Sequence, residues 1–406
     1  MSKSHASASI FSPEHYAATR LPLHRASPLP GWCYVSNEWY AREVDTLFRR
    51  DWLCVGRADQ IPEPGDYFTI ELLRHPLIVV RDENGDVHVH SALCRHRGAV
   101  IAQDAGHCRA FVCPYHSWTY SLSGALTSTP GSPPPMAGAE GFSPRDYGLT
   151  PVRSAQWGGF VFITFNDDAE PLQQWLGDLP AFLADYDLES MRFTHRDEYV
   201  VDCNWKVWLE NAFENYHAMT IHRRHMDPAK PQNWQFKRTR GPWEAMFSKR
   251  SIVAYSGLPE IPGLDPKKAA GLYHVWIQPS VQIILTSSYM KFRQYLPEGP
   301  EKLRLYENWA FPRSTVERPD FGEIVGPAYY EKYSAIVRED RGINPNVQKG
   351  MASGAYRPGR YSLEEYIVHR IANRVLDRVV GPDDPRSRAL REGEPAQAAE
   401  ASAATA

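Results

Sequence analysis

Residues 93–118 read LCRHRGAVIAQDAGHCRAFVCPYHSW, and they contain two Cys–His pairs, Cys94 with His96 and Cys113 with His116. Structural zinc sites usually group their ligands as a cysteine pair with a histidine pair, or as four cysteines. Here each loop would supply one thiolate and one imidazole. This alternation suits a cluster of two irons and two sulfides, in which one iron takes both thiolates and the other takes both imidazoles. Structural zinc is the alternative.

The flanking sequence predicts a small antiparallel β domain around this stretch. Between about residues 55 and 125, short β-rich segments alternate with turns, and DENGD at 82–86 is typical of a hairpin. We expect this domain to span residues 45–165. His107 and Cys108 lie in the same stretch but outside the paired pattern, and we interpret them as loop residues.

Both cysteine–histidine loops resemble those of the Rieske family. CRHRG matches the family motif C-x-H-R-G, and CPYHSW matches C-P-Y-H-x-W with its flanking proline and tryptophan. The resemblance implies a Rieske [2Fe-2S] cluster with a defined set of ligands: Cys94, His96, Cys113 and His116. Since neutral imidazoles replace two thiolate charges, such a cluster has a raised reduction potential and accepts electrons from a flavin- or ferredoxin-type donor.

A second group of candidate residues lies in WLENAFENYHAMTIHRRH, at 208–225. On one continuous helix, Glu210, Glu214 and His217 would share a face, because they occupy positions i, i+4 and i+7. Acids and histidines on one face more often form a solvated stripe than a site, so this pattern alone does not assign a function.

The two histidines of this segment, His217 and His222, are five residues apart. On a straight helix their side chains would point about 140° apart. If both bind one metal, the helix must bend or end, and we expect this near Thr220. On spacing alone His225 is a rival ligand, since it lies eight residues after His217 and returns to nearly the same face.

This segment resembles the catalytic domain of Rieske oxygenases, in which Asn-Trp-Lys precedes a Glu-Asn pair, an acid and an H-x4-H motif. The chain has NWK at 204–206 and the remaining residues in the same order. The resemblance implies that His217 and His222 bind a mononuclear Fe(II), with Asn211 close to it. Glu214 resembles the acid that links the cluster of one subunit to the iron of the next, which implies a ring of subunits, most often a homotrimer.

The third iron ligand is expected to be a carboxylate, which would complete a triad of two histidines and one acid with open positions for O₂. In the family it comes from a Glu-Asp pair followed by a glutamine eight residues after the Asp. Glu339, Asp340 and Gln348 match this pattern. The expected ligand is Asp340 and Glu339 is the fallback, although Pro345 departs from the family pattern.

The sequence as a whole predicts an α+β protein. We expect an N-terminal arm and helix over 1–44 that pack on the catalytic domain, the Rieske domain over 45–165, and a disordered tail over 383–406. Between them, residues 166–382 would form a helix-grip catalytic domain, an antiparallel sheet around a long C-terminal helix at 362–380. The pattern of that last segment is amphipathic with helical spacing.

Composition limits the remaining choices. The net charge of −3 in 406 residues gives no field for nucleic acid or a membrane surface. No apolar run approaches the roughly 20 residues that span a bilayer, and the N-terminus lacks the form of a signal peptide, so we expect a cytoplasmic protein. Six cysteines are too few for a secreted disulfide scaffold.

The expected activity is that of a terminal oxygenase, which activates O₂ at the mononuclear Fe(II) with electrons from the cluster. No G-x-G-x-x-G motif is present, so NAD(P)H would act through a separate flavin- or ferredoxin-type reductase. Residues 347–369 resemble oxygenases that hydroxylate or N-demethylate betaine- and carnitine-like compounds. A small quaternary amine is therefore the expected substrate.

Two alternatives stay open from the sequence. One is ring hydroxylation of an aromatic compound or aromatic carboxylic acid, whose carboxylate would pair with an arginine such as Arg238, Arg240 or Arg250. The other is an electron-transfer or structural metal-binding protein without oxygenase activity.

Overall fold

The computed structural model describes residues 9–133, 135–224, 234–237, 239–248 and 257–383. His225, Arg238, Arg250 and all but the first residue of the predicted tail lie outside these residues. The chain forms two compact units. Unit 1 contains the described parts of 1–49, 176–186 and 194–406, and unit 2 contains those of 50–175 and 187–193.

Unit 2 is built from short antiparallel strands, as the sequence predicts. They form three sheets, with the orders β1-β10-β9, β4-β3-β2-β5 and β6-β7-β8. The strands are β1 (Leu53–Arg57), β2 (Asp66–Leu72), β3 (His75–Arg81), β4 (Val87–Ser91), β5 (Ala105–His107), β6 (Phe111–Val112), β7 (Thr119–Tyr120), β8 (Leu126–Ser128), β9 (Arg153–Trp157) and β10 (Phe160–Thr164). DENGD forms the predicted hairpin between β3 and β4, where Asp82 Oδ1 accepts the backbone N–H groups of Asn84 and Asp86.

Unit 1 is organised around one seven-stranded sheet with the order β11-β17-β16-β15-β14-β13-β12. The pairs from β12 to β17 are antiparallel. The strands are β11 (Met191–Val201), β12 (Trp234–Lys237), β13 (Trp243–Ser248), β14 (Leu272–Ile277), β15 (Val281–Leu285), β16 (Met290–Gly299) and β17 (Lys302–Pro312). Every residue of strands β13 and β15 and of the first eight positions of β16 is buried, so both faces of the sheet are covered there.

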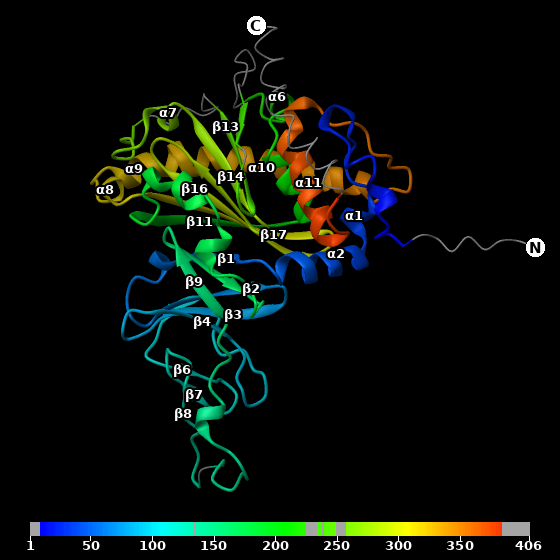
Figure 1. The fold of residues 1–406 in the computed structure, drawn as a ribbon. Coiled ribbons are helices and arrows are strands. Elements are labelled where there is room, and N and C mark those ends of the chain that lie inside the picture. Colours follow the sequence, from blue (N-terminus) through cyan, green and yellow to red (C-terminus); the bar gives the residue numbers. More distant parts are fainter. Residues whose placement is uncertain (1–8, 134, 225–233, 238, 249–256, 384–406) are drawn as a thin grey trace, which may run out of the picture. The chain divides into compact units, whose positions relative to one another are not determined.

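Two helices after the sheet cover the same face of it (Figure 1). Helix α10 spans Lys332–Met351 and helix α11 spans Tyr366–Val379. Glu244 of β13 binds Arg370 and Arg374 of α11, and Arg293 of β16 donates to the hydroxyl of Tyr333 in α10. In the strand register Glu244 and Arg293 lie in one row across the sheet, so they point to the same side. The antiparallel sheet with helices on one face confirms the predicted α+β class.

Segments before strand β12 add further helices to unit 1. They are α1 (Trp32–Val35), α2 (Asn37–Glu43), α5 (Trp205–Ala212) and α6 (Ala218–Ile221). Helix α2 contacts α11, and α5 contacts both α10 and β16. The helix expected over 362–380 begins at Tyr366, after a 3₁₀ turn that Ser362 and Glu365 cap reciprocally. Among the helices that the structure describes, none has both the length and the apolar character needed to cross a membrane.

Candidate active site

The two cysteine–histidine loops of unit 2 have the same backbone design. The N–H of Cys94 donates to the carbonyl of Ala99, and that of Cys113 donates to the carbonyl of Trp118, each at 2.8 Å. Four residues after each cysteine the backbone turns through a positive φ, 75° at Gly98 and 56° at Ser117. Each loop therefore closes on itself within six residues, and its ligands are placed by local geometry.

The loops bury their cysteines and expose their histidines. Cys94 and Cys113 are 3% and 1% exposed, belong to one apolar cluster and form no disulfide. The rings of His96 and His116 lie 4.6 Å apart at the surface. The structure thus places the two predicted cysteine ligands in one buried cluster and the two predicted histidine ligands side by side at the surface. Two thiolates and two imidazoles are the donor set that a Rieske cluster requires.

Neighbouring aromatic residues hold this arrangement. The hydroxyl of Tyr120 lies 3.2 Å from Cys94 Sγ and accepts the N–H of Arg95, and the indole of Trp118 stacks on His96 at 4.9 Å. Partial burial and the neighbouring imidazole of His116 lower the pKa of His96, which favours the neutral ligand form. The contact of Tyr120 with Cys94 was not predicted from the sequence, because Tyr120 lies outside both motifs.

The interpretation of His107 as a loop residue is wrong, because it is the last residue of strand β5, whereas Cys108 follows that strand and lies in neither a helix nor a strand. The imidazole of His107 is exposed and lies 2.9 Å from the carboxylate of Asp66. Cys108 is half-buried and its backbone N–H donates to the carbonyl of Gly65.

The second group of predicted ligands also converges, in unit 1. Ligand atoms of His217, His222 and Asp340 all lie within 4.8 Å of one another. The two Nε2 atoms are 3.2 Å apart, and Asp340 Oδ1 lies 3.1 Å from that of His222 and 3.7 Å from that of His217. Within the described residues no other group of three acids, histidines or cysteines meets this criterion.

A break in the helix brings the two histidines to one point. A helix ends near Thr220 as expected, because α6 ends at Ile221, but the continuous helix expected before it is wrong, because α5 already ends at Ala212 and α6 has a single turn. His217 and His222 are the residues at the two ends of α6. The carboxylate of Glu214 accepts the backbone N–H of His217, and this bond replaces the missing intrahelical bond.

The expected shared face of Glu210, Glu214 and His217 is also wrong for the same reason. Glu210 still belongs to α5 and accepts a hydrogen bond from the hydroxyl of Tyr34, at 2.8 Å. Glu214 lies beyond the helix end and contacts His217 Nδ1 at 2.5 Å. Asn211 is half-buried in the last turn of α5, and its place near a metal stays a prediction.

Each histidine has a carboxylate behind it. Glu214 contacts Nδ1 of His217, and Glu339 contacts Nδ1 of His222 at 2.9 Å. Such outer carboxylates orient metal-binding imidazoles and fix the tautomer that leaves Nε2 for the metal. Burial opposes a charge on His222, but the carboxylates of Asp340 and Glu339 outweigh it and raise the pKa of that residue. From the sequence Glu339 was predicted only as a fallback ligand. Its contact with His222 joins residues 117 positions apart and forms only when α10 packs near α6.

The donor set of this group fits a bound divalent metal. Oδ1 of Asp340 is buried and makes no well-aligned hydrogen bond with any described residue, although two imidazole nitrogens face it. Two imidazoles and one carboxylate with a free side are the ligands of non-haem Fe(II) sites that react with O₂. Helix α10 carries Asp340 and continues through Pro345, so that residue does not break it.

Arg240 lies at the turn before β13, where its backbone N–H binds Asp178.

Comparisons with known proteins agree with this architecture. Residues 51–147 match the family described as "Rieske [2Fe-2S] domain", and residues 188–381 match "Ring hydroxylating alpha subunit (catalytic domain)". Choline monooxygenase from Arabidopsis thaliana is 31% identical over 364 residues, which cover 86% of this chain and 82% of that protein. The chain is a Rieske oxygenase.

Other Rieske oxygenases show similar coverage. The glycine betaine monooxygenase oxygenase subunit of Chromohalobacter salexigens is 27% identical over 374 residues, which cover 82% of this chain and 81% of that protein. Among solved structures, the quaternary ammonium monooxygenase CntA with L-carnitine has a TM-score of 0.74 at 20% identity, covering 90% of this chain and 98% of that one. Naphthalene 1,2-dioxygenase from Rhodococcus gives 0.75 at 20% identity, with 92% and 100% covered. At this identity the two structures support the fold alone.

Proposed function

We propose that this Rieske oxygenase is the terminal component of a monooxygenase that hydroxylates or N-demethylates a small quaternary amine. The observation that carries the proposal is the convergence of His217, His222 and Asp340 in a chain that also contains a Rieske domain. A mononuclear Fe(II) in this triad supplies reductive activation of O₂. The residues that hold the Rieske cluster in this proposal are Cys94, His96, Cys113 and His116.

The protein's own residues would orient the reaction. Glu214 and Glu339 hold the Nδ1 atoms of the two imidazoles, which would leave each Nε2 free to bind the iron, and burial of Asp340 keeps bulk water from one side of the site. Each hydroxylation consumes one O₂, two electrons and two protons, and it yields one hydroxylated product and one water. Hydroxylation of an N-methyl group of a quaternary amine gives an N-hydroxymethyl ammonium, which releases formaldehyde and a proton and leaves a tertiary amine with one methyl group fewer.

We propose that electrons pass between subunits of a homotrimer, from the cluster of one subunit to the mononuclear iron that the neighbouring subunit would hold, with Glu214 of that neighbour linking the two centres. Unusually exposed apolar side chains on both units support this arrangement, since such side chains mark interaction surfaces. In unit 2 they lie in or beside the cluster loops, and they are Leu93, Val100, Val112 and Tyr115. In unit 1 they lie around α6 and before α11, and they are Tyr216, Met219 and Leu363. A separate cytoplasmic reductase would transfer electrons from NAD(P)H to the cluster.

The substrate class rests on the relatives, whose names specify choline, glycine betaine and quaternary ammonium compounds. A screen of stimulated O₂ uptake tests it, with the holoenzyme, NADH and a surrogate reductase. Choline, glycine betaine and carnitine form one arm, and benzoate-type acids form the other. We expect a quaternary amine to stimulate uptake and to yield a hydroxylated or demethylated product in equal amount. Stimulation by an aromatic acid alone would refute the substrate class, and no stimulation in His217→Ala would tie the uptake to the triad.

A further inference from the structure

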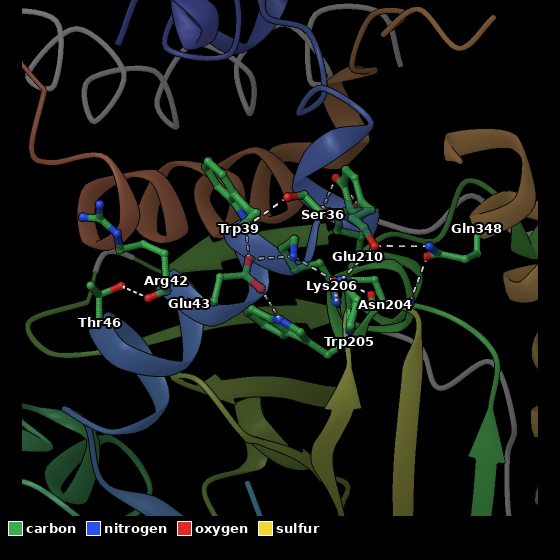
Figure 2. Close-up of polar contacts among 12 residues, drawn as sticks. Ser36, Trp39, Arg42, Glu43, Thr46, Asn204, Trp205, Lys206, Glu210 and Gln348 are labelled. Carbon is green, nitrogen blue, oxygen red and sulfur yellow. Dashed lines mark hydrogen bonds and ion pairs between the residues drawn. The ribbon is translucent and has the colours of Figure 1, made fainter. Parts of the chain in front are cut away.

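A buried polar network joins the two helices on which the triad depends (Figure 2). We call it the helix clamp and define it as Glu43, Asn204, Lys206 and Gln348. Their exposed fractions lie between 0% and 3%. Glu43 ends α2, Asn204 and Lys206 begin α5, and Gln348 lies near the end of α10. Polar groups buried this deeply are costly unless every one is hydrogen-bonded, so their contacts can be followed one by one.

The direct link between the helices is the pair Asn204 and Gln348. The backbone N–H of Asn204 donates to Gln348 Oε1 at 2.9 Å. Both side-chain amides then donate to the same acceptor, the carbonyl of Tyr34, each at 3.2 Å. The remaining bonds are from Asn204 Nδ2 to the carbonyl of Pro300 at 2.6 Å, and from Gln348 Nε2 to Glu301 at 3.1 Å. Asn204, the N-cap residue of α5, is thereby tied to one side chain of α10.

The second half of the clamp fixes α5 against α2. Lys206 Nζ donates to Glu43 at 2.6 Å and to Asn204 Oδ1 at 2.8 Å, and neither side chain of the ion pair has any exposure. The indoles of Trp39 and Trp205 donate to the same carboxylate. Oδ1 of Asn204 also accepts the backbone N–H of Lys206, so it caps α5.

The helix clamp connects the two segments that supply the triad residues. Helix α5 starts after Asn204 and leads to the break that positions His217 and His222. On α10, Asp340 lies eight residues before Gln348, which is about 12 Å along the helix axis. Apolar contacts alone allow two packed helices to shift along each other. Hydrogen bonds have narrow distance and angle ranges, so they form in only one alignment of the two helices. A metal site requires its ligand atoms within a few tenths of an ångström, so the register of α5 on α10 determines whether the three ligands meet.

We infer that Gln348 and Asn204 are positioning residues for the metal triad, acting through the register of α5 on α10. The inference rests on the proposed metal site, and not on the identity of the substrate. A purely structural role predicts that a change at Gln348 lowers stability alone. A positioning role predicts that it also weakens metal binding, in proportion to the hydrogen bonds lost.

Metal binding by the full-length protein separates the two roles. Gln348→Met keeps the side-chain length but removes both the acceptor and the donor, whereas Gln348→Glu keeps the acceptor for the N–H of Asn204. The control is Asn373→Leu, because Asn373 is a buried helical amide of α11 that binds the carbonyls of Thr19 and His369 and does not join α5 to α10. For each variant, Co²⁺ is titrated into protein whose mononuclear site has been emptied, and the visible spectrum, the Rieske spectrum and Tm are recorded.

We expect Gln348→Met to weaken Co²⁺ binding by about 10–100-fold and to alter the cobalt spectrum. Gln348→Glu should weaken it less, and the Rieske spectrum should stay unchanged in both. Asn373→Leu should lower Tm by a similar amount and leave the Co²⁺ affinity within about twofold. Wild-type affinity in both Gln348 variants, or an equal loss in Asn373→Leu, would overturn the inference. If wild-type protein itself binds no Co²⁺, the proposed metal site fails and the inference fails with it. Should Gln348→Met not fold, the comparison of Gln348→Glu with Asn373→Leu decides the question.

Discussion

The two predicted metal sites of this chain are built in opposite ways. The cluster loops of unit 2 each close within six residues, through the paired bonds that begin at Cys94 and Cys113. The triad of unit 1 joins residues up to 123 positions apart, on α6 and α10. A site of the first kind depends on local loop geometry, whereas a site of the second kind depends on how helices pack. Variants can therefore damage either site while the other survives.

The largest effect is expected from the triad itself. His217→Ala should reduce substrate-dependent O₂ uptake by more than about 100-fold, because it removes a ligand of the reacting metal. The visible and EPR spectra of the Rieske cluster should remain, since its loops do not involve α6. His195→Ala is the matched control, because His195 is also half-buried and lies in an ion pair, with Asp197. Loss of the Rieske spectrum in His217→Ala would break the independence of the two sites.

The converse variant is Cys113→Ser, which removes a buried thiol from the cluster loops. We expect it to lose the cluster and all reductase-dependent turnover, yet to keep Co²⁺ binding at the triad within a few-fold. Cys108→Ser should change neither, because Cys108 lies outside the paired loops. The contradiction would come from a stable cluster in Cys113→Ser, or from its loss in Cys108→Ser.

The free energy of unfolding of unit 1 should depend on pH through one buried acid, Glu210, which lies outside the cluster loops. Burial is the main cause that raises the pKa of Glu210, to about 7 from an ordinary value of 4.5, although its bond to Tyr34 and the charge of Lys206 oppose the shift. Its folded form holds the proton more tightly, so this contribution to stability is full below pH 4.5 and is lost as the pH rises through 7. Its size is up to about 3 kcal/mol.

Glu210→Gln should remove this dependence. From pH 5 to pH 8, wild-type protein should lose more free energy of unfolding than the variant, by up to about 3 kcal/mol. Urea unfolding at both pH values, followed by tryptophan fluorescence, measures the difference. Parallel pH profiles for the two proteins would show that Glu210 is not protonated in the folded state.

The smallest expected effect tests the shared design of the cluster loops. Gly98→Ala should destabilise unit 2 by about 1 kcal/mol, since a Cβ at φ +75° is strained although nothing lies within 4 Å of it. Ser117→Gly relieves the same strain in the other loop and should stabilise by about 0.5 kcal/mol, because the greater freedom of unfolded glycine offsets part of the gain. Thermal unfolding of the holoprotein measures both changes. Shifts of the same sign would contradict the parallel between the loops.

The contrast between the sites also explains what the sequence could predict. The four cluster ligands lie in two short motifs, and local geometry then keeps them together. The α+β class followed from alternating β-rich segments and from the family resemblance, and it is confirmed. The predicted triad needed the resemblance, because no spacing rule connects His222 to Asp340.

Other features depend on packing and could not be read from periodicity. The end of α5 at Ala212 follows from a side chain, Glu214, that takes the N–H of His217. The contact of Glu339 with His222 exists only after α10 has packed. The clamp pair, Asn204 and Gln348, was visible as part of family motifs, but its hydrogen bond spans 144 residues.

Metal analysis of the purified protein determines whether one chain holds two separate iron sites. Wild-type protein reconstituted without oxygen should contain about three irons and two acid-labile sulfides per chain, as expected for a Rieske cluster and one mononuclear iron. Asp340→Ala should contain about two of each, with an unchanged Rieske spectrum. Two irons in wild-type protein, or zinc without sulfide, would contradict the account.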